Sequence, residues 1–542
     1  MIIDDLYIKT NKNNFYLGIV TQVYKNNCVC QIENLSWLKS RRINMEYLIP
    51  NTINFHVIID SAEGIFIGEA YQSKIQNTDS IHYALTHSEH EKVFPEVSID
   101  IIGIMKNGET KFQPVGFYNV GLTDKVYFAN SEVNKKYLES MELSRKSKEY
   151  CESRTKLEPF AKVVNMSSQE LSLYPETLFD RHLLAIGATN SGKSTSSLSV
   201  VDKLIKADKK VLVIDPTGEY FDSFSGAEVK KLVLGNDTIL DPGKVSFSQW
   251  ATLFETNDSS QPAVLADAIR SLRFQKKHGE GGVYRKNGKT IGSVLKDMET
   301  LSSVDLSFDL ALLPSQITEE SVEVDKSMTK YQVGAFQFNN KQWLVQKVKY
   351  KLESASLIDF FSDSDTKNDL LKILDQFMND DIKSVYINAS KIGIGEGIGS
   401  MIVDLVSNYI VNNKKKDNVA FVIFVDEVHR YSKDIQSGGY QTGLTAIARE
   451  GRKKGIFLFL TTQNPKDIPD ELLGQIGSLL VHRLTHKSEL DSIRNYMSES
   501  SFKQVSKLNQ GEGILTSINL LEDLHLTVDE CARIHHKSTI QL

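Results

Sequence analysis

The residues with the most distinctive chemical spacing form the run Gly187–Ser194, which reads Gly-Ala-Thr-Asn-Ser-Gly-Lys-Ser. It satisfies the phosphate-binding pattern G-x-x-x-x-G-K-[ST] at each fixed position. An apolar run, Leu183–Ile186, leads into it, and apolar residues at helical spacing follow it from Leu198 to Ile205. The order strand, loop, helix distinguishes a phosphate loop from an ordinary glycine-rich turn, and it predicts nucleotide binding here.

In such a loop the glycines let the backbone approach a phosphate, and the unpaired N–H groups of the following helix attract the anion. Lys193 is expected to reach the β- and γ-phosphates, and Ser194 to ligate Mg²⁺. The predicted nucleotide-binding residues are Gly187, Ala188, Thr189, Asn190, Ser191, Gly192, Lys193, Ser194, Thr195 and Asp215.

Two adjacent carboxylates follow the apolar run Phe421–Val425, as a second phosphate-site element requires. Asp426 is expected to hold Mg²⁺, and Glu427 to orient and deprotonate the water that attacks the γ-phosphate. Many strands end in surface acids, so this pattern is specific only in combination with the loop at Gly187–Ser194.

Asp215 has two interpretations of equal weight. It ends the apolar run Val211–Ile214 and precedes Pro216, so it either contributes to the nucleotide site or stabilises a turn at a strand end.

Further downstream, Arg449 and Arg452 lie three residues apart, on one face of a helix that extends so far. A guanidinium here could stabilise phosphate charge in a neighbouring subunit's site, and a solvated basic helix end is the alternative. The run Ile456–Leu460 then leads to Thr461, Thr462 and Gln463. Gln463 is the candidate sensor of the γ-phosphate or the attacking water.

The elements that must position these residues indicate an α/β fold. From Arg181 onwards, buried strands are expected at 183–186, 211–214, 385–389, 421–425, 456–460 and 479–481, alternating with helices around a parallel sheet. The long interval from about 221 to 381 predicts an inserted, largely helical subdomain, with helices over 263–274 and 342–361. Residues 1–155 carry short runs of β-formers that predict a small β-barrel and a charged linker, so residues 156–542 form the second domain.

Composition limits the function further. The 542 residues contain 41% apolar and 24% charged residues with a net charge of −6, which argues against a protein that binds polyanions over its whole surface. The four cysteines form no disulfide or zinc pattern, and no metal other than Mg²⁺ is expected. The acidic start and the absence of a membrane-length apolar run predict a cytoplasmic protein without membrane contact.

Taken together, these motifs resemble those of the HerA family of hexameric DNA translocases, in the group that includes the FtsK-type motors. The matching pieces are Arg181–Ser194, Asp215–Tyr220, Val425–Arg430, Ala448–Lys453, Thr462–Pro465 and Gly511–Leu515. Val428 stands where the family usually has Ala, and Thr217 where it often has His.

The resemblance implies a RecA-like P-loop ATPase core behind an N-terminal barrel, with ATP and Mg²⁺ bound by Lys193, Ser194, Asp426 and Glu427. It suggests that Arg181 and Arg452 act across the subunit interface, and it favours the nucleotide-site interpretation of Asp215. It also implies a homo-hexamer that holds duplex DNA in its channel and acts with a nuclease or a sirtuin-like effector, possible settings being DNA end processing and anti-phage defence.

Three stretches are candidates for DNA contact: the basic residues of 270–289, the glycine-rich run 391–399, and residues 436–440. The leading interpretation is an ATP-driven DNA translocase or helicase. A nucleotide-regulated scaffold ring that activates an effector is the alternative, and a conjugation- or secretion-type motor is a third, disfavoured because such motors usually carry membrane segments.

Overall fold

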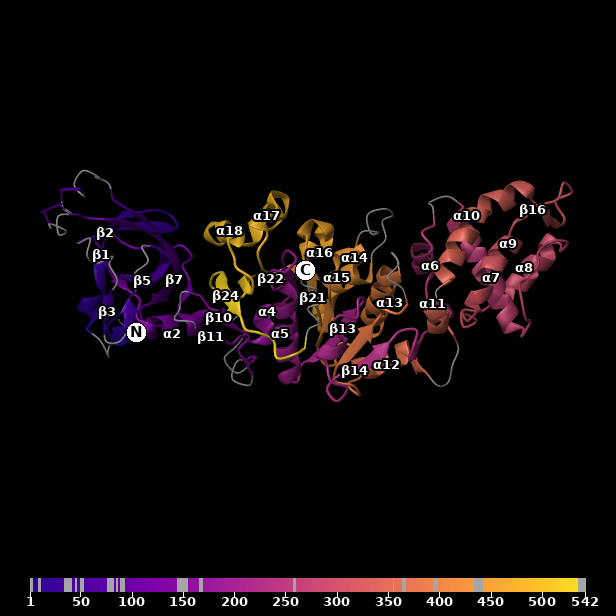
Figure 1. Cartoon of the computed structure of the whole chain (residues 1–542), viewed down its shortest axis with the longest axis horizontal. Coiled ribbons are helices and arrows are strands. Elements are labelled where there is room, and N and C mark those ends of the chain that lie inside the picture. Colours follow the sequence, from indigo (N-terminus) through magenta and orange to yellow (C-terminus); the bar gives the residue numbers. More distant parts are fainter. Residues whose placement is uncertain are drawn as a thin grey trace, which may run out of the picture. The chain divides into compact units, whose positions relative to one another are not determined.

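The computed structural model of the chain divides into two compact units (Figure 1), one made of residues 1–180 and 477–529 and the other of residues 181–476 and 530–542. The structure describes residues 3–7, 11–33, 41–43, 46–48, 53–75, 82–83, 86–87, 93–143, 155–164, 169–256, 260–353, 355–362, 367–392, 398–432 and 442–534. The predicted domain border at residue 155 falls inside the first unit, because the C-terminal strands pack there. No described helix is both long and apolar enough to cross a membrane.

A six-stranded antiparallel barrel opens the first unit and confirms the predicted small barrel. Its strands follow the order β2-β1-β9-β5-β6-β7, and the pairing of β2 with β7 closes it. Gly18 allows β1 to approach β2, since a Cβ there would lie 2.0 Å from the carbonyl oxygen of Gln31. The strands are β1 (Tyr16–Val23), β2 (Asn27–Ile32), β5 (Phe55–Ser61), β6 (Gly64–Lys74), β7 (Glu96–Lys106) and β9 (Lys125–Phe128).

A second antiparallel sheet completes the first unit, in the order β11-β10-β24-β23-β22. It joins β10 (Ala161–Val163) and β11 (Glu170–Leu171) to three strands from the C-terminal part of the chain, β22 (Ile476–Val481), β23 (Glu512–Ser517) and β24 (Leu524–Val528). Helix α2 (Ser131–Ser140) leaves the barrel and begins at Asn130, whose side chain accepts a hydrogen bond from the Val133 N–H. The sequence analysis anticipated β22 alone among these strands.

The second unit contains the predicted parallel sheet, in the order β12-β21-β20-β13-β19-β14. All its pairings are parallel, and nearly every strand residue is buried, as in a sheet covered on both faces. The strands are β12 (His182–Ile186), β13 (Lys210–Asp215), β14 (Lys230–Val233), β19 (Val385–Asn388), β20 (Phe421–Val425) and β21 (Ile456–Thr462). Strand β14 lies inside the interval 221–381 but belongs to the sheet, so the insertion begins after it.

Helices make up most of the insertion, and several of them lie together in one group in Figure 1. They are α6 (Phe247–Leu253), α7 (Gln261–Lys277), α8 (Ile291–Glu299), α9 (Leu313–Glu319), α10 (Ala335–Leu352), α11 (Ala355–Phe360) and α12 (Leu370–Met378). Trp250 is fully buried among them, stacked on Phe254 with ring centroids 5.7 Å apart. The parallel pairing of β15 (Thr238–Ile239) with β18 (Asn368–Asp369) joins the two ends of the insertion.

Candidate functional site

The run Gly187–Ser194 has the backbone of a phosphate loop. It connects β12 to helix α5 (Lys193–Lys206), and the residue at the helix N-cap is Gly192, whose φ of 104° lies in the left-handed region. Glycine adopts this conformation without strain, whereas a Cβ would oppose it. The helix therefore begins with its first N–H groups directed at the loop, where they can bind an anion.

The parallel register brings the predicted chemical groups to one edge of the sheet. Ile186 pairs with Thr462, and Val425 pairs with Leu460, so β12, β20 and β21 end side by side. The Gly187 N–H also donates to the Thr462 carbonyl oxygen at 3.3 Å. The phosphate loop, the paired acids and the polar end of β21 consequently face the same region, as a nucleotide site requires.

The centre of this region is an ion pair between Lys193 and Glu427. Their Nζ and Oε1 atoms are 2.6 Å apart, and the two side chains are only 5% and 12% exposed. Gln463 Nε2 donates to the same carboxylate oxygen at 3.0 Å, and Thr189 Oγ1 donates to Gln463 Oε1 at 3.1 Å. A continuous polar chain therefore links the phosphate loop to Glu427 through Gln463.

Thr461 organises the two acids. Its hydroxyl donates to Asp426 Oδ1 and accepts a hydrogen bond from the Glu427 N–H at 2.8 Å. Glu427 has a φ of 48°, which is a strained conformation for a residue with a side chain and is common at functional sites. The turn separates the two carboxylates, so that Asp426 remains in the sheet edge while Glu427 reaches Lys193.

The acids have opposite electrostatic environments. Burial raises the pKa of Asp426 to about 6, against the effects of the Thr461 hydroxyl and Lys193. Burial also acts to raise the pKa of Glu427, but His429 and Lys193 outweigh it and lower this pKa to about 2. Glu427 is therefore ionised and neutralised by its neighbours, whereas Asp426 is a buried carboxylate that a cation would stabilise.

These residues fit an Mg²⁺–nucleotide ligand. Ser191 is 1% exposed, and within the described chain its hydroxyl has no hydrogen-bond partner, which leaves it available to a ligand at the loop. Ser194 and Thr195 lie in the first turn of α5, and Asp426 directly follows strand β20. Ser194 and Asp426 would hold the metal, and Lys193 would exchange Glu427 for phosphate oxygens.

Asp215 is fully buried and bonded on all sides. Its Oδ1 accepts from the Thr217 N–H, the Thr217 hydroxyl and the Gly218 N–H, and its Oδ2 accepts from the Tyr220 N–H and the Tyr386 hydroxyl. These five donors are the contacts of a residue that holds the turn after β13. A role of Asp215 in nucleotide binding stays a prediction.

The two arginines predicted to act across a subunit interface lie at the other edge of the sheet. Arg181 immediately precedes β12, and Arg452 lies in the last turn of α15 (Gly443–Lys454), just before β21 begins. His182 fixes this corner by accepting from the Leu458 N–H at 2.9 Å and facing the Ala448 carbonyl oxygen at 3.1 Å. The length of β12, about 16 Å at 3.3 Å per residue, separates both exposed arginines from Lys193 of the same chain.

The basic residues of 270–289 are largely engaged within the insertion. Lys286 is buried and pairs with Glu320, and Lys277 Nζ lies 2.7 Å from Asp305 Oδ2. Arg270, Lys276 and Arg285 are exposed, and of these Arg270 donates from Nη2 to the Met298 carbonyl oxygen at 3.3 Å. The other two candidate DNA-contact stretches lie in part (residues 393–397) or wholly (residues 436–440) outside the described residues.

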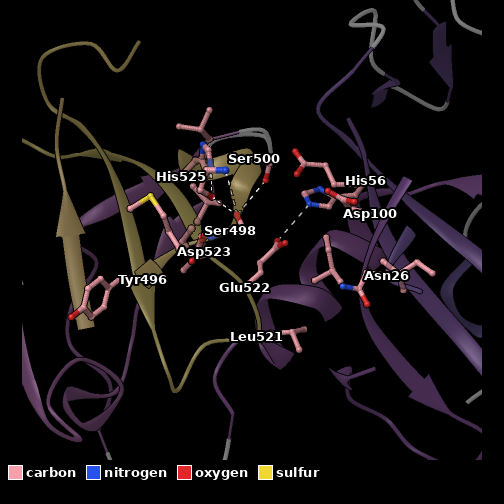
Figure 2. A pocket seen from close by; sticks show the side chains of 18 of the residues that line it. Asn26, His56, Asp100, Tyr496, Ser498, Ser500, Leu521, Glu522, Asp523 and His525 are labelled. Carbon is pink, nitrogen blue, oxygen red and sulfur yellow. Dashed lines mark hydrogen bonds and ion pairs between the residues drawn. The ribbon is translucent and has the colours of Figure 1, made fainter. Parts of the chain in front are cut away.

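A polar pocket of about 590 Å³ lies in the first unit (Figure 2). Barrel residues and residues near β24 line it, among them Asp100, Asp523 and His525. His56 is buried, and its Nε2 lies 3.9 Å from Glu522 Oε1. Burial lowers the pKa of His56 to about 4 and raises that of Glu69 to about 7, so both groups favour their neutral forms. This cluster has no sequence motif that could have predicted it, because its members are scattered along the chain.

Two family profiles match consecutive parts of the chain. "Helicase HerA, central domain" matches residues 159–413, and "Helicase HerA-like C-terminal" matches residues 407–530. The matched region includes the phosphate loop, both acids, Gln463 and Arg452.

Curated relatives align over the same part of the chain. A probable helicase of Methanocaldococcus jannaschii is 24% identical over 368 residues, which are 65% of this chain and 63% of that protein. The DNA double-strand break repair helicase HerA of Saccharolobus solfataricus is 22% identical over 346 residues, and its counterpart from Sulfolobus acidocaldarius is 26% identical over 348, in each case 62% of both chains. The alignments span less than two thirds of each of these relatives.

Among solved structures, VirB4 of Thermoanaerobacter pseudethanolicus has a TM-score of 0.47 at 12% identity, covering 69% of this chain and 96% of that one. The bacterial conjugative coupling protein TrwB, in complex with sulphate, has a TM-score of 0.46 at 12% identity, covering 73% of this chain and 98% of that one.

Proposed function

The chain belongs to the HerA family of P-loop ATPases, and we propose that it is an ATP-driven DNA translocase or helicase. The observation that carries the proposal is the buried contact of Lys193 with Glu427, joined through Gln463 to Thr189 of the phosphate loop. This arrangement joins in one network the residues proposed as the phosphate-binding cation (Lys193), the base (Glu427) and the polar sensor (Gln463). The names of the curated relatives, which are helicases, support DNA as the substrate on which the motor acts.

The proposed hydrolysis begins with the exchange of the Lys193 contact. When Lys193 moves to the β- and γ-phosphates, Glu427 loses one of the groups that lower its pKa and becomes a stronger base. Its carboxylate accepts a proton from water, the water oxygen bonds to the γ-phosphorus, and the bond to the β-phosphate oxygen breaks. Ser194 and Asp426 would hold Mg²⁺, which would supply positive charge to neutralise the phosphates. Gln463 contacts both Glu427 and Thr189, so a movement of Glu427 is transmitted through Gln463 to Thr189.

We infer that the working form is a ring, with a homo-hexamer as the expected size. Arg181 and Arg452 lie a strand length away from Lys193 of their own chain, which supports their acting in the site of a neighbouring subunit. An arginine supplied in this way stabilises charge as the phosphoryl group transfers. ATP binding between subunits would then couple hydrolysis to subunit movement along duplex DNA.

DNA contact is proposed for the exposed basic side chains of the insertion, Arg270, Lys276 and Arg285. Lys286 is excluded from this set because its ammonium is buried against Glu320. Phosphate contacts of this kind are independent of sequence, as translocation requires.

A nucleotide-regulated scaffold ring is the second candidate function. It is favoured by the pairing of Lys277, Lys286 and Lys289 with acids of their own insertion, which reduces the basic surface available to DNA. In either case we propose a partner with its own chemistry, a nuclease or a sirtuin-like effector, acting in DNA end processing or anti-phage defence.

The test compares ATP turnover by the wild type and by Glu427→Gln, with and without duplex DNA. We expect turnover that duplex DNA stimulates in the wild type and that Glu427→Gln lowers to a small residual rate while nucleotide binding persists. Turnover without DNA stimulation, together with no displacement of a labelled strand, would refute the translocase and favour the scaffold.

A further inference from the structure

The carboxylate of Glu427 has different neighbours on its two oxygens. Oε1 accepts the contacts of Lys193 at 2.6 Å and Gln463 at 3.0 Å. Oε2 faces the imidazole of His429, whose Nδ1 lies 3.0 Å away. The first oxygen is therefore on the phosphate side of the site, and the second is on the side of the segment that follows the acids.

The backbone holds His429 in place on that side. Val428 is fully buried, and its N–H donates to the Thr461 carbonyl oxygen at 2.9 Å. The Glu427 N–H is bound to the Thr461 hydroxyl, so both ends of this short turn are attached to β21. His429 then begins helix α14 (His429–Ser432), and its side chain is only 20% exposed. The imidazole is thus held close to β21, which Gln463 directly follows.

Nucleotide binding changes only one side of this arrangement. Lys193 lies in the phosphate loop and must turn from Glu427 towards the phosphates, which removes the shortest contact of Oε1. His429 does not belong to the loop, so its contact with Oε2 can persist. A carboxylate held by one oxygen keeps the other directed at the attacking water, and small errors in such positions have large kinetic effects.

We propose that His429 is a positioning residue, which holds Glu427 in its catalytic orientation after Lys193 has moved to the nucleotide. The proposal rests on the roles proposed above for Lys193 and Glu427. In this structure Nδ1 and Oε2 lie 3.0 Å apart without hydrogen-bond alignment. The proposal assigns to His429 a hydrogen bond from Nδ1–H to Oε2 that forms when Glu427 is released by Lys193, and no contact with ATP.

The test uses His429→Ala and His429→Asn in the full chain. Asparagine places a donor near the position of Nδ1, whereas alanine removes it. We expect His429→Ala to lower kcat of basal ATP turnover about 10- to 100-fold with KM changed less than about 3-fold, and His429→Asn to retain most of the rate. Affinity for a fluorescent ATP analogue and the melting temperature should stay near the wild-type values.

A double-mutant cycle with Glu427→Gln separates positioning from a general structural role. Because His429 acts through Glu427, His429→Ala should add no further loss to the residual rate of Glu427→Gln. An equal loss in both backgrounds, a rise of KM at constant kcat, or asparagine no better than alanine would overturn the proposal. Basal turnover is measured without DNA, so a failure of DNA stimulation refutes the translocase alone. Absence of any wild-type turnover would overturn both.

Discussion

The substitution Glu69→Gln should make the stability of the first unit less dependent on pH. Glu69 lies on β6 and lines the polar pocket shown in Figure 2. Burial raises its pKa to about 7, from an ordinary value of 4.5, and the nearby charge of Asp100 acts in the same direction. Burial and these carboxylates also raise the pKa of Glu522. Glutamine keeps the shape of the side chain and cannot ionise.

The direction in which pH changes the free energy of unfolding follows from the number of protons bound by each state. Between about pH 4.5 and 7 the folded protein keeps a proton on Glu69 that the unfolded chain releases, so the free energy of unfolding falls as the pH rises through this range. A difference of about 2.5 pKa units corresponds to about 3 kcal/mol at most. For a unit of this size each kcal/mol shifts the melting temperature by about 2–4 °C. His56 acts oppositely, since its neutral form is favoured in the fold and its contribution is lost as the pH falls towards 4.

The assay is calorimetric melting of the wild type and Glu69→Gln at pH 5 and pH 8, with Glu63→Gln as the control because Glu63 is an exposed carboxylate at the end of the same β5–β6 hairpin. The melting temperature of Glu69→Gln should exceed that of the wild type by several degrees at pH 8, and by much less at pH 5. A difference that is equal at the two pH values would refute the reasoning, since a purely steric effect of glutamine does not depend on pH.

Three further predictions concern the second unit. Lys193→Ala should abolish binding of a fluorescent ATP analogue without changing the melting temperature by more than a few degrees; unchanged affinity would remove Lys193 from the site. Asp215→Ala should lower the free energy of unfolding by at least about 3 kcal/mol, because several buried donors lose their acceptor. Tyr386→Phe removes one of the five hydrogen-bond donors to Asp215 and should cost about 2 kcal/mol. Equal melting temperatures of the two variants would contradict this. Replacing Arg270, Lys276 and Arg285 by Gln should lower the salt slope of DNA binding by up to about 3, and Lys415→Gln should leave it unchanged; an unchanged slope in the triple variant would exclude that surface.

Local sequence was sufficient to predict the phosphate loop and the strands around it. The residue types of Gly187–Ser194 were enough to predict the backbone of the loop. The apolar runs at β12, β13 and β20 end next to the polar residues that were predicted to form the site. The sequence also predicted α7 closely. It did not separate α10 from α11, since both carry apolar residues at helical spacing and the break between them has no proline or glycine.

The partners of the site residues could not be predicted, because they depend on contacts between distant segments. Lys193 and Glu427 are 234 residues apart, and Asp215 is joined to Tyr386 across 171 residues. The basic stretch at 270–289 was predicted to be a candidate DNA contact because its internal partners could not be foreseen: the acid that buries Lys286 is Glu320, on another part of the insertion. Short strands such as β14, β23 and β24 were missed because a few apolar residues give too weak a periodic signal.

Arg181 and Arg452 lie on the sheet edge away from Lys193, and this placement affects how many complete active sites an assembly contains. An interface that joins one edge of a subunit to the opposite edge of the next is a head-to-tail contact. Such contacts form a closed ring only when the rotation between successive subunits brings the last subunit back to the first. If Arg181 and Arg452 act in the site of the neighbouring subunit, as proposed, the last phosphate loop in any open row of subunits lacks its arginines. Only closure gives every copy a complete site, so mixing Arg452→Ala with Glu427→Gln subunits should restore activity at those junctions where each supplies its intact half.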